Sequence, residues 1–203
     1  SKKEVSLDLA HSGRKTKQLI EVKDASFSYS DKNIINNLTA TIFKNDKIAL
    51  IGKNGQGKTT LINLLRDKLQ FTSGNIKRAE YLNIKVFSQN RDSLDLSKTP
   101  FDIIGDGQDF VHLPDGRNQH VNSYLENFLF QSTEIRRPIS TLSGGEKNRL
   151  QLALFMKEVA DVWVFDEPTN DLDIETIEIL ESKLRDYKGA VIIISHDRAF
   201  LDN

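Results

Sequence analysis

Short, continuous apolar runs alternate with longer segments of helical spacing from residue 47 to the end of the chain. Such runs are typical of parallel strands that are buried on both faces. We predict these strands over residues 47–51, 82–89, 162–167 and 189–196. The predicted helices between them cover residues 58–68, 147–158 and 175–185. This alternation predicts an α/β fold, with a mostly parallel sheet and flanking helices.

The first 43 residues have a different pattern, with the polar and apolar alternation of antiparallel strands. Strands are predicted over 5–9, over 19–29 with a break near Asp24, and over 34–43 with an interruption at Asn36 and Asn37. We therefore expect an antiparallel β edge beside the parallel sheet. On this basis the chain divides into a lead-in strand and basic turn, residues 1–18, and a main domain, residues 19–203.

The pattern changes again over about 91–158, where we expect a small helical lobe. A short helix is predicted from Thr99 to Ile104, and a second over residues 122–130. Between them, the turn sequence 113–117 predicts a hairpin. His112 and His120 are placed to face each other across it, but two histidines are too few for a metal site, so we interpret both as surface residues.

Composition limits the class of protein. The chain has 203 residues, a formal net charge of −1 and no cysteine. It contains no run of about 18 apolar residues and no apolar signal-peptide core, so we expect no membrane insertion. The absence of cysteine is compatible with the cytoplasm. The near-neutral charge gives no global basic field that would attract nucleic acid.

A glycine-rich loop between the strand 47–51 and the following helix fits the phosphate-binding pattern G-x-x-x-x-G-K-[ST]. The candidate ATP-binding residues here are Gly52, Lys53, Asn54, Gly55, Gln56, Gly57, Lys58, Thr59 and Thr60. Backbone N–H groups of such a loop bind phosphates, lysine reaches the β- and γ-phosphates, and the Thr59 hydroxyl is placed to ligate Mg²⁺. A glycine-rich turn without a ligand is the alternative, and it leaves the lysine and hydroxyl unexplained.

Five further polar or aromatic residues lie at the ends of predicted strands. Asp166 and Glu167 follow a buried strand, where Asp166 can hold Mg²⁺ and Glu167 can polarise an attacking water. Gln89 can ligate Mg²⁺, and His196 is delivered to the same sheet edge. Tyr29 can stack on a base. Taken singly, each has a structural alternative: a strand cap, a strand-end amide or histidine, or a tyrosine packed on a loop.

The segment from Leu142 to Glu146 precedes the helix predicted over 147–158. Ser143 and Glu146 form a capping box, with Ser143 as the N-cap. The N–H groups of Gly144 and Gly145 also form a second anion-binding position at a helix N-terminus. The segment therefore has a structural role and a candidate role in binding phosphate.

In this order, the phosphate loop, Gln89, Leu142–Glu146, Asp166–Glu167 and His196 resemble an ATP-binding-cassette (ABC) ATPase domain over nearly the whole chain. Glu146, where transporters usually carry Gln, makes the chain most similar to the ABC-F branch. The segments 166–173 and 195–203 also resemble the ABC-F branch. The segment 109–130 and the lead-in ending at Gly13 and Arg14 are similar to the Uup type within that branch.

The resemblance implies a P-loop fold and a dimeric sandwich, in which ATP on one cassette is capped by the signature residues Leu142, Ser143, Gly144, Gly145 and Glu146 of another. It implies Mg-dependent ATP hydrolysis with Glu167, His196 and Gln89 as catalytic residues. The metal ligands would be Thr59, Gln89 and Asp166. ATP and Mg²⁺ are the implied cofactors.

Gln89 follows Lys58 by only 31 positions, which leaves no room for the arm found in first cassettes of ABC-F proteins. We therefore expect an excised second cassette without its closing strands, which alone is a monomer or a weak ATP-dependent dimer. Its expected partners are the other cassette of the same full-length chain and the ribosome or branched DNA. The alternatives are a nucleotide-binding subunit of a membrane transporter and a non-hydrolysing ATP switch.

Overall fold

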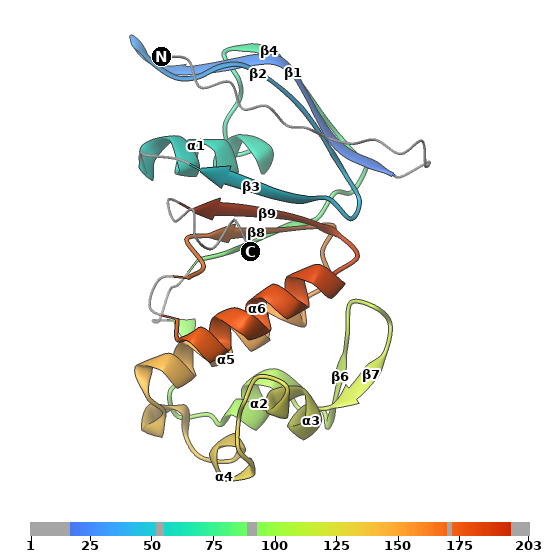
Figure 1. Cartoon of the computed structure of the whole chain (residues 1–203), viewed down its shortest axis with the longest axis vertical. Coiled ribbons are helices and arrows are strands. Elements are labelled where there is room, and N and C mark those ends of the chain that lie inside the picture. Colours follow the sequence, from blue (N-terminus) through green and yellow to red (C-terminus); the bar gives the residue numbers. More distant parts are fainter. Residues whose placement is uncertain (1–16, 52–54, 89–92, 170–171, 196–203) are drawn as a thin grey trace.

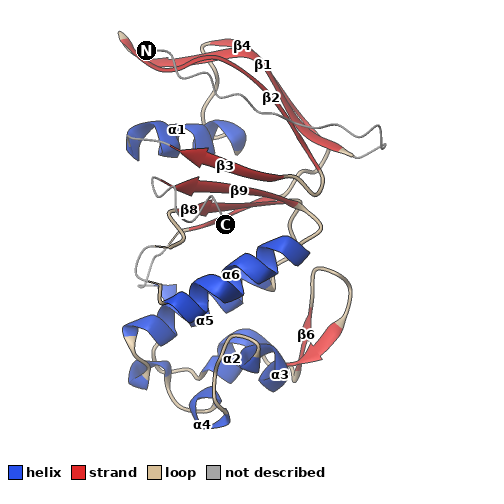
Figure 2. Ribbon diagram, in the orientation of Figure 1, coloured by secondary structure: helices blue, strands red, loops and turns tan. Residues whose placement is uncertain are grey.

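Two sheets and a group of helices lie one above another in the computed structural model (Figure 1). It describes residues 17–51, 55–88, 93–169 and 172–195. An antiparallel sheet forms one end, a parallel sheet lies at the centre, and most of the helices form the other end (Figure 2). The α/β fold predicted from the sequence is thus confirmed.

The antiparallel sheet has the strand order β2-β1-β4. Its strands are β1 (Gln18–Tyr29), β2 (Lys32–Phe43) and β4 (Ser73–Arg78). The parallel sheet has the order β3-β9-β8-β5. Its strands are β3 (Lys47–Ile51), β5 (Ile84–Phe87), β8 (Val162–Asp166) and β9 (Ala190–Ser195). The predicted strand 5–9 lies outside the described residues.

Helix α1 (Gly55–Leu65) lies between the two sheets, while α5 (Gly144–Met156) and α6 (Ile174–Asp186) cover the opposite face of the parallel sheet (Figure 1). Smaller elements lie beyond α5 and α6. They are α2 (Pro100–Gly105), the hairpin β6 (Phe110–His112) and β7 (Asn118–His120), α3 (Val121–Glu126), α4 (Ser132–Ile135) and a 3₁₀ turn (Ile139–Thr141).

Strand β8 is buried on both faces, which explains its uninterrupted apolar sequence. Val162 and Val164 pack into the core beneath the antiparallel sheet. Trp163 and Phe165 point to the opposite face and pack into the core formed with α5 and α6. A strand covered in this way has no solvent-facing side, so polar residues can occur only at its ends.

Helix α1 begins and ends about three residues earlier than the apolar spacing predicts. Asp67 adopts a left-handed conformation with φ of 63°, which ends the helical turn. The guanidinium of Arg78 donates to the last carbonyls of the helix, Leu65 O at 2.9 Å and Leu64 O at 2.5 Å. The missing C-terminal bonds of α1 are therefore supplied by a side chain of β4, which sequence spacing alone does not reveal.

The break predicted near Asp24 is a bulge in β1. The pairing with β2 shifts between Val22 and Ala25, and Asp24 has φ of 48°. Here β4 approaches so closely that a Cβ on Gly74 would lie 2.2 Å from Asp24 O. Glycine at 74 therefore lets β4 pair with β1 from Ser73 onward.

The predicted helix 122–130 ends at Glu126. Leu129 takes a left-handed conformation with φ of 66°, and the Phe130 N–H donates back to Leu125 O at 3.1 Å. Phe128 and Phe130 are buried nevertheless. Both rings thus pack into the core after the helix has ended, and their spacing in the sequence resembles that of a helix for this reason.

The predicted hairpin is present, but the histidines do not face each other as expected. His120 is paired with Phe110, and His112 is paired with Asn118. The His120 ring accepts a hydrogen bond from the Asn122 N–H at 3.1 Å, so this histidine caps α3. In the described residues no group of three potential metal-binding side chains occurs.

None of the helices in the described ranges is both long enough and apolar enough to cross a lipid bilayer.

Tyr187 provides a test of packing between α6 and β8. Its ring stacks on Trp163 at a centroid distance of 3.6 Å, and its hydroxyl donates to Ala160 O. Burial raises the pKa of Tyr187 well above its usual value of 10. The folded protein therefore keeps this proton to higher pH than the unfolded chain, so stability falls as pH rises above 10.

We expect Tyr187→Phe to lower the free energy of unfolding at pH 7 by about 1 kcal/mol, because Ala160 O loses its donor. We also expect a smaller loss of stability above pH 10 than in the wild type. Urea unfolding between pH 7 and 11 measures both effects. Tyr81→Phe is the matched control, since Tyr81 is 92% exposed. Identical pH profiles for wild type and Tyr187→Phe would contradict the assignment.

Candidate functional site

The candidate site lies at the carboxyl edge of the parallel sheet. Strands β3, β9, β8 and β5 all run in one direction, so the segments that follow them leave from the same edge. Ligands bind at this edge in open α/β sheets. Among the predicted residues, Gly52, Lys53, Asn54, Gln89 and His196 lie outside the described residues.

Lys58 and Glu167 form an ion pair across this edge. Lys58 lies on α1, which follows β3, whereas Glu167 directly follows β8. Both side chains are largely buried, with exposed fractions of 11% and 18%. The structure thus brings together the phosphate-loop lysine and the predicted catalytic acid, which are 109 residues apart in the sequence.

Glu167 is held by its backbone as well. It has a left-handed conformation, with φ of 50°. Its N–H donates to Ile194 O of β9 at 2.8 Å. Because β9 pairs with both β8 and β3, this bond fixes the turn after β8 onto the strand next to the phosphate-loop strand. The position of Glu167 is therefore set by the sheet.

Asp166 is the last residue of β8. Burial raises the pKa of its carboxyl group, and the charge of Glu167 adds to this effect, while Lys58 opposes it. Because burial disfavours the ionised carboxylate, an additional positive charge beside it would stabilise it. A divalent cation would supply this charge, since Mg²⁺ is typically held by one or two carboxylates together with substrate phosphates.

The two threonines after Lys58 differ in exposure. Thr59 is exposed, and Thr60 is 2% exposed. Hydroxyl and carboxylate oxygens are the hard donors that magnesium prefers, so Thr59 and Asp166 fit a magnesium site. The buried position of Thr60 fits packing of the first turns of α1. Gly55 and Gln56 belong to the start of this helix.

Tyr29 ends β1, where its ring packs edge-on against Phe27 at 4.8 Å and stays 41% exposed. The same end of the antiparallel sheet approaches the start of α1. A Cβ on Gly57 would lie 3.9 Å from Cγ2 of Ile34, whose neighbour Ile35 pairs with Phe27. An aromatic ring thus lies on the element that approaches the phosphate-loop helix.

Ser143 caps α5 as the sequence predicts. Its hydroxyl accepts from the Glu146 N–H at 3.1 Å, and the Glu146 carboxylate accepts from the Ser143 N–H at 3.0 Å. Leu142 is buried, while Gly144 and Gly145 are exposed. A Cβ on Gly145 would meet no atom within 4 Å. The helix N-terminus is therefore open to an approaching group.

Arg149 was not predicted as a site residue. It lies on α5 and is only 9% exposed. Its guanidinium donates to Thr176 Oγ1 and pairs with Asp173, both at 3.2 Å, and it reaches Leu129 O at 3.4 Å. Asp173 is the N-cap of α6, and its bonds with Thr176, followed by the charge of Arg149, lower its pKa.

This network joins the helix that begins at Ser143 to the segment that follows Glu167. The sequence does contain a signal for this network. The polar residues Asn148, Arg149 and Gln151 are interspersed on α5 with the core residues Leu150 and Leu152. Buried polar residues of this kind need partners. Their partners are distant in the sequence, so the pattern alone could not identify them.

Residues 35–170 match the protein-family model described as ABC transporter. The ATP-binding protein Uup of Haemophilus influenzae is 44% identical over 197 residues, which cover 97% of this chain and 30% of that protein. Uup of Escherichia coli is 40% identical, with coverages of 97% and 31%. The Energy-dependent translational throttle protein EttA of Haemophilus influenzae is 37% identical, with coverages of 91% and 33%.

The chain therefore spans about a third of the length of these curated relatives. Among solved structures, cbiO1 from Clostridium perfringens, part of an ABC transporter complex, has a TM-score of 0.66, with 89% of this chain and 79% of that chain covered. An inward-facing metal-chelate type ABC transporter has a TM-score of 0.63, with 91% and 75% covered. Both are 22% identical, so they show the fold alone.

We expect Arg149→Met to lower the free energy of unfolding by about 2 kcal/mol, because hydrogen bonds to a charged group are lost and Thr176 keeps no side-chain partner on α5. Urea unfolding at pH 7 measures the change. Arg185→Met is the control, since Arg185 is an exposed cation in the last turn of α6. A loss no larger than that of the control would mean that the network does not join the two helices.

Proposed function

Since the chain belongs to the ABC transporter family, we propose that it is the ATP-binding and ATP-hydrolysing cassette of an ABC-F protein of the Uup type. The ion pair between Lys58 and Glu167 carries this proposal. It unites the lysine of the phosphate loop with the acid of the β8 edge. The similarity to Uup and EttA supports the choice of branch.

Lys58 is proposed to bind the β- and γ-phosphates together with the loop residues 52–60. In the structure this lysine neutralises Glu167. Phosphate oxygens would compete with Glu167 for the same ammonium group. Nucleotide binding therefore separates the pair and leaves the Glu167 carboxylate available to accept a proton from the attacking water. The loop and the acid are thus coupled through one cation.

Thr59, Gln89 and Asp166 are proposed to hold magnesium, which when bound offsets the negative charge of the phosphates. Glu167 acts as the general base, a role that typically contributes 10²–10⁴-fold to rate. His196 is proposed to contact the γ-phosphate side of the site, and Tyr29 to stack on the base. Most of the catalytic effect in such sites comes from positioning and electrostatics.

The open helix N-terminus at Ser143, Gly144 and Gly145 is proposed to cap ATP bound to a second cassette, with Leu142 and Glu146 holding the segment in place. One cassette then supplies half of each composite site. The chain's coverage of about a third of its relatives suits one cassette of a longer chain. We propose that it is the second one, and that alone it is a monomer or a weak ATP-dependent dimer.

We propose a cytoplasmic protein that acts on the ribosome or on branched DNA. The printed name of EttA, a translational throttle, favours the ribosome. A transporter subunit is less favoured, because the likeness to transporter structures is at 22% identity and concerns the fold. A non-hydrolysing switch is less favoured, because Glu167 is present and paired with Lys58.

We expect Lys58→Ala to weaken binding of Mg-ATP at least tenfold, because the cation that compensates the phosphates is lost. Isothermal titration with Mg-ATP measures this affinity. Lys68→Ala is the matched control, since Lys68 is an exposed lysine just beyond α1. Equal affinities for wild type and Lys58→Ala would remove Lys58 from the phosphate site.

We expect Glu167→Gln to bind ATP at least as tightly as the wild type, because the amide competes less strongly for Lys58. Hydrolysis should be slower by 10²-fold or more, since the amide cannot accept a proton. Single-turnover assays of the assembled protein and light scattering with Mg-ATP measure hydrolysis and dimer formation. Glu178→Gln, on the exposed face of α6, is the control.

The closed dimer should disappear when Ser143→Arg is added to Glu167→Gln, because the arginine obstructs the open helix N-terminus. Turnover by Glu167→Gln at the wild-type rate would show that Glu167 is not the base. A dimer that persists with Ser143→Arg would show that the signature segment does not cap the partner's nucleotide.

A further inference from the structure

A cavity of about 320 Å³ lies at the edge of the parallel sheet opposite to Lys58 and Glu167. It is lined by residues at the amino ends of β8 and β9, such as Asp161 and Gly189, whereas the candidate ATP site lies at their carboxyl ends. The turn between β6 and β7 and the end of α6 complete the wall. The cavity therefore shares no residue with the proposed nucleotide site.

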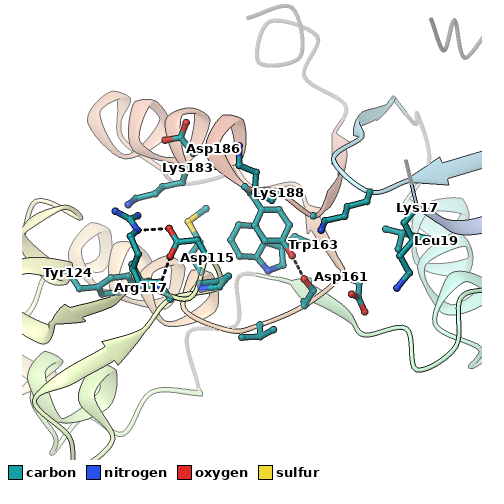
Figure 3. A pocket seen from close by; sticks show the side chains of 18 of the residues that line it. Lys17, Leu19, Asp115, Arg117, Tyr124, Asp161, Trp163, Lys183, Asp186 and Lys188 are labelled. Atoms are coloured by element: carbon teal, nitrogen blue, oxygen red, sulfur yellow. Dashed lines mark hydrogen bonds and ion pairs between the residues drawn. The ribbon is translucent and has the colours of Figure 1, made fainter. Parts of the chain in front are cut away.

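The inner wall of this cavity is apolar. Leu19, Phe128, Met156 and Trp163 are each less than 5% exposed and line it. Trp163 lies at its centre, with Asp115 and Arg117 on one side and Lys17 and Leu19 on the other (Figure 3). A pocket of this size with an apolar wall falls in the range of small-molecule sites.

Two aromatic side chains of this wall differ in their hydrogen bonding. Tyr187 stacks on Trp163 at 3.6 Å and donates its hydroxyl proton to Ala160 O. Glycine at 189 makes room for that ring, since a Cβ there would lie 2.6 Å from it. By contrast, the buried indole N–H of Trp163 has no acceptor in the part of the chain that the structure describes. Because this nitrogen atom is buried, it is enclosed within the wall, and Trp163 contributes the apolar surface of its ring to the cavity.

The rim of the cavity is mainly cationic. Five basic side chains line it, Lys17, Lys44, Arg117, Lys183 and Lys188, against three carboxylates, Asp115, Asp161 and Asp186. Two of these carboxylates are already engaged: Asp115 pairs with Arg117 at 2.6 Å, and Asp161 accepts from the Asn83 N–H at 2.8 Å.

The four lysines of the rim have no ion pair within the described ranges. The ammonium group of Lys183 lies over the ring of Phe128 at 5.4 Å, and burial lowers its pKa. Lys47, behind the wall, donates to Tyr187 O at 2.6 Å and to Gly189 O at 2.9 Å. The basic side chains that line the cavity outnumber its carboxylates.

We propose that this cavity binds a small amphipathic organic anion, an aromatic or medium-chain carboxylate in its chemical class. The apolar body of such a ligand occupies the space beside Phe128, Met156 and Trp163. Its anionic group is held by the rim lysines. A neutral ligand of the same shape makes only the apolar contacts and lacks the charge interaction with the lysines.

The test uses 8-anilinonaphthalene-1-sulfonate as the anionic probe and N-phenyl-1-naphthylamine as its neutral counterpart. Trp163 is the single tryptophan of the 203-residue chain, so its fluorescence reports on this cavity directly. We expect saturable quenching with one equivalent of the anionic probe and at least tenfold weaker binding of the neutral probe. Equal affinities, or quenching without saturation, would overturn the proposal.

Two sets of variants locate the site. Lys44→Gln combined with Lys188→Gln should weaken binding of the anionic probe at least fivefold and leave binding of the neutral probe unchanged. Val159→Glu, at a wall residue that is 66% exposed, should weaken the anionic probe by introducing a like charge. Lys68→Gln with Lys85→Gln is the matched control at exposed lysines outside the cavity. If the cavity variants and the control bind the anionic probe equally, the cavity is not the site.

Discussion

The burial of β8 on both faces is the constraint on which the rest of the structure depends. Val162 and Val164 require a cover on one side, supplied by the antiparallel sheet and α1, and Trp163 and Phe165 require another, supplied by α5 and α6. With both faces covered, charged residues are confined to the two ends of the strand. The carboxyl end carries Asp166 and Glu167, and the amino end opens into the cationic cavity.

Electrostatic balance at the carboxyl end explains how distant segments become one site. Two adjacent carboxylates at a buried strand end repel each other, and burial raises the pKa of Asp166. Lys58 pairs with Glu167, and its charge also offsets part of the rise in the pKa of Asp166. This charge imbalance is the basis of the proposal that the same edge binds a second cation and that incoming phosphate groups compete for Lys58.

Much of the fold was predictable because strand burial and helix spacing leave a direct signal in the sequence. The sequence pattern predicted the parallel strands, the capping box at Ser143, and the position of Lys58, Asp166 and Glu167 at one sheet edge. What escaped prediction depends on partners remote in sequence. Arg78 closes α1, Gly74 admits β4 against the Asp24 bulge, and Arg149 joins α5 to Asp173. In each contact the partner residue belongs to another element, and no local sequence pattern identifies it.

The left-handed backbone at Glu167 places two opposing demands on this position. A side chain in this conformation costs roughly 1–2 kcal/mol relative to glycine. Glycine or asparagine would accept the same φ of 50° with less strain, but neither would supply the carboxylate that pairs with the largely buried Lys58. Backbone strain and compensation of a buried charge therefore oppose each other at one residue, so this position tolerates few residue types.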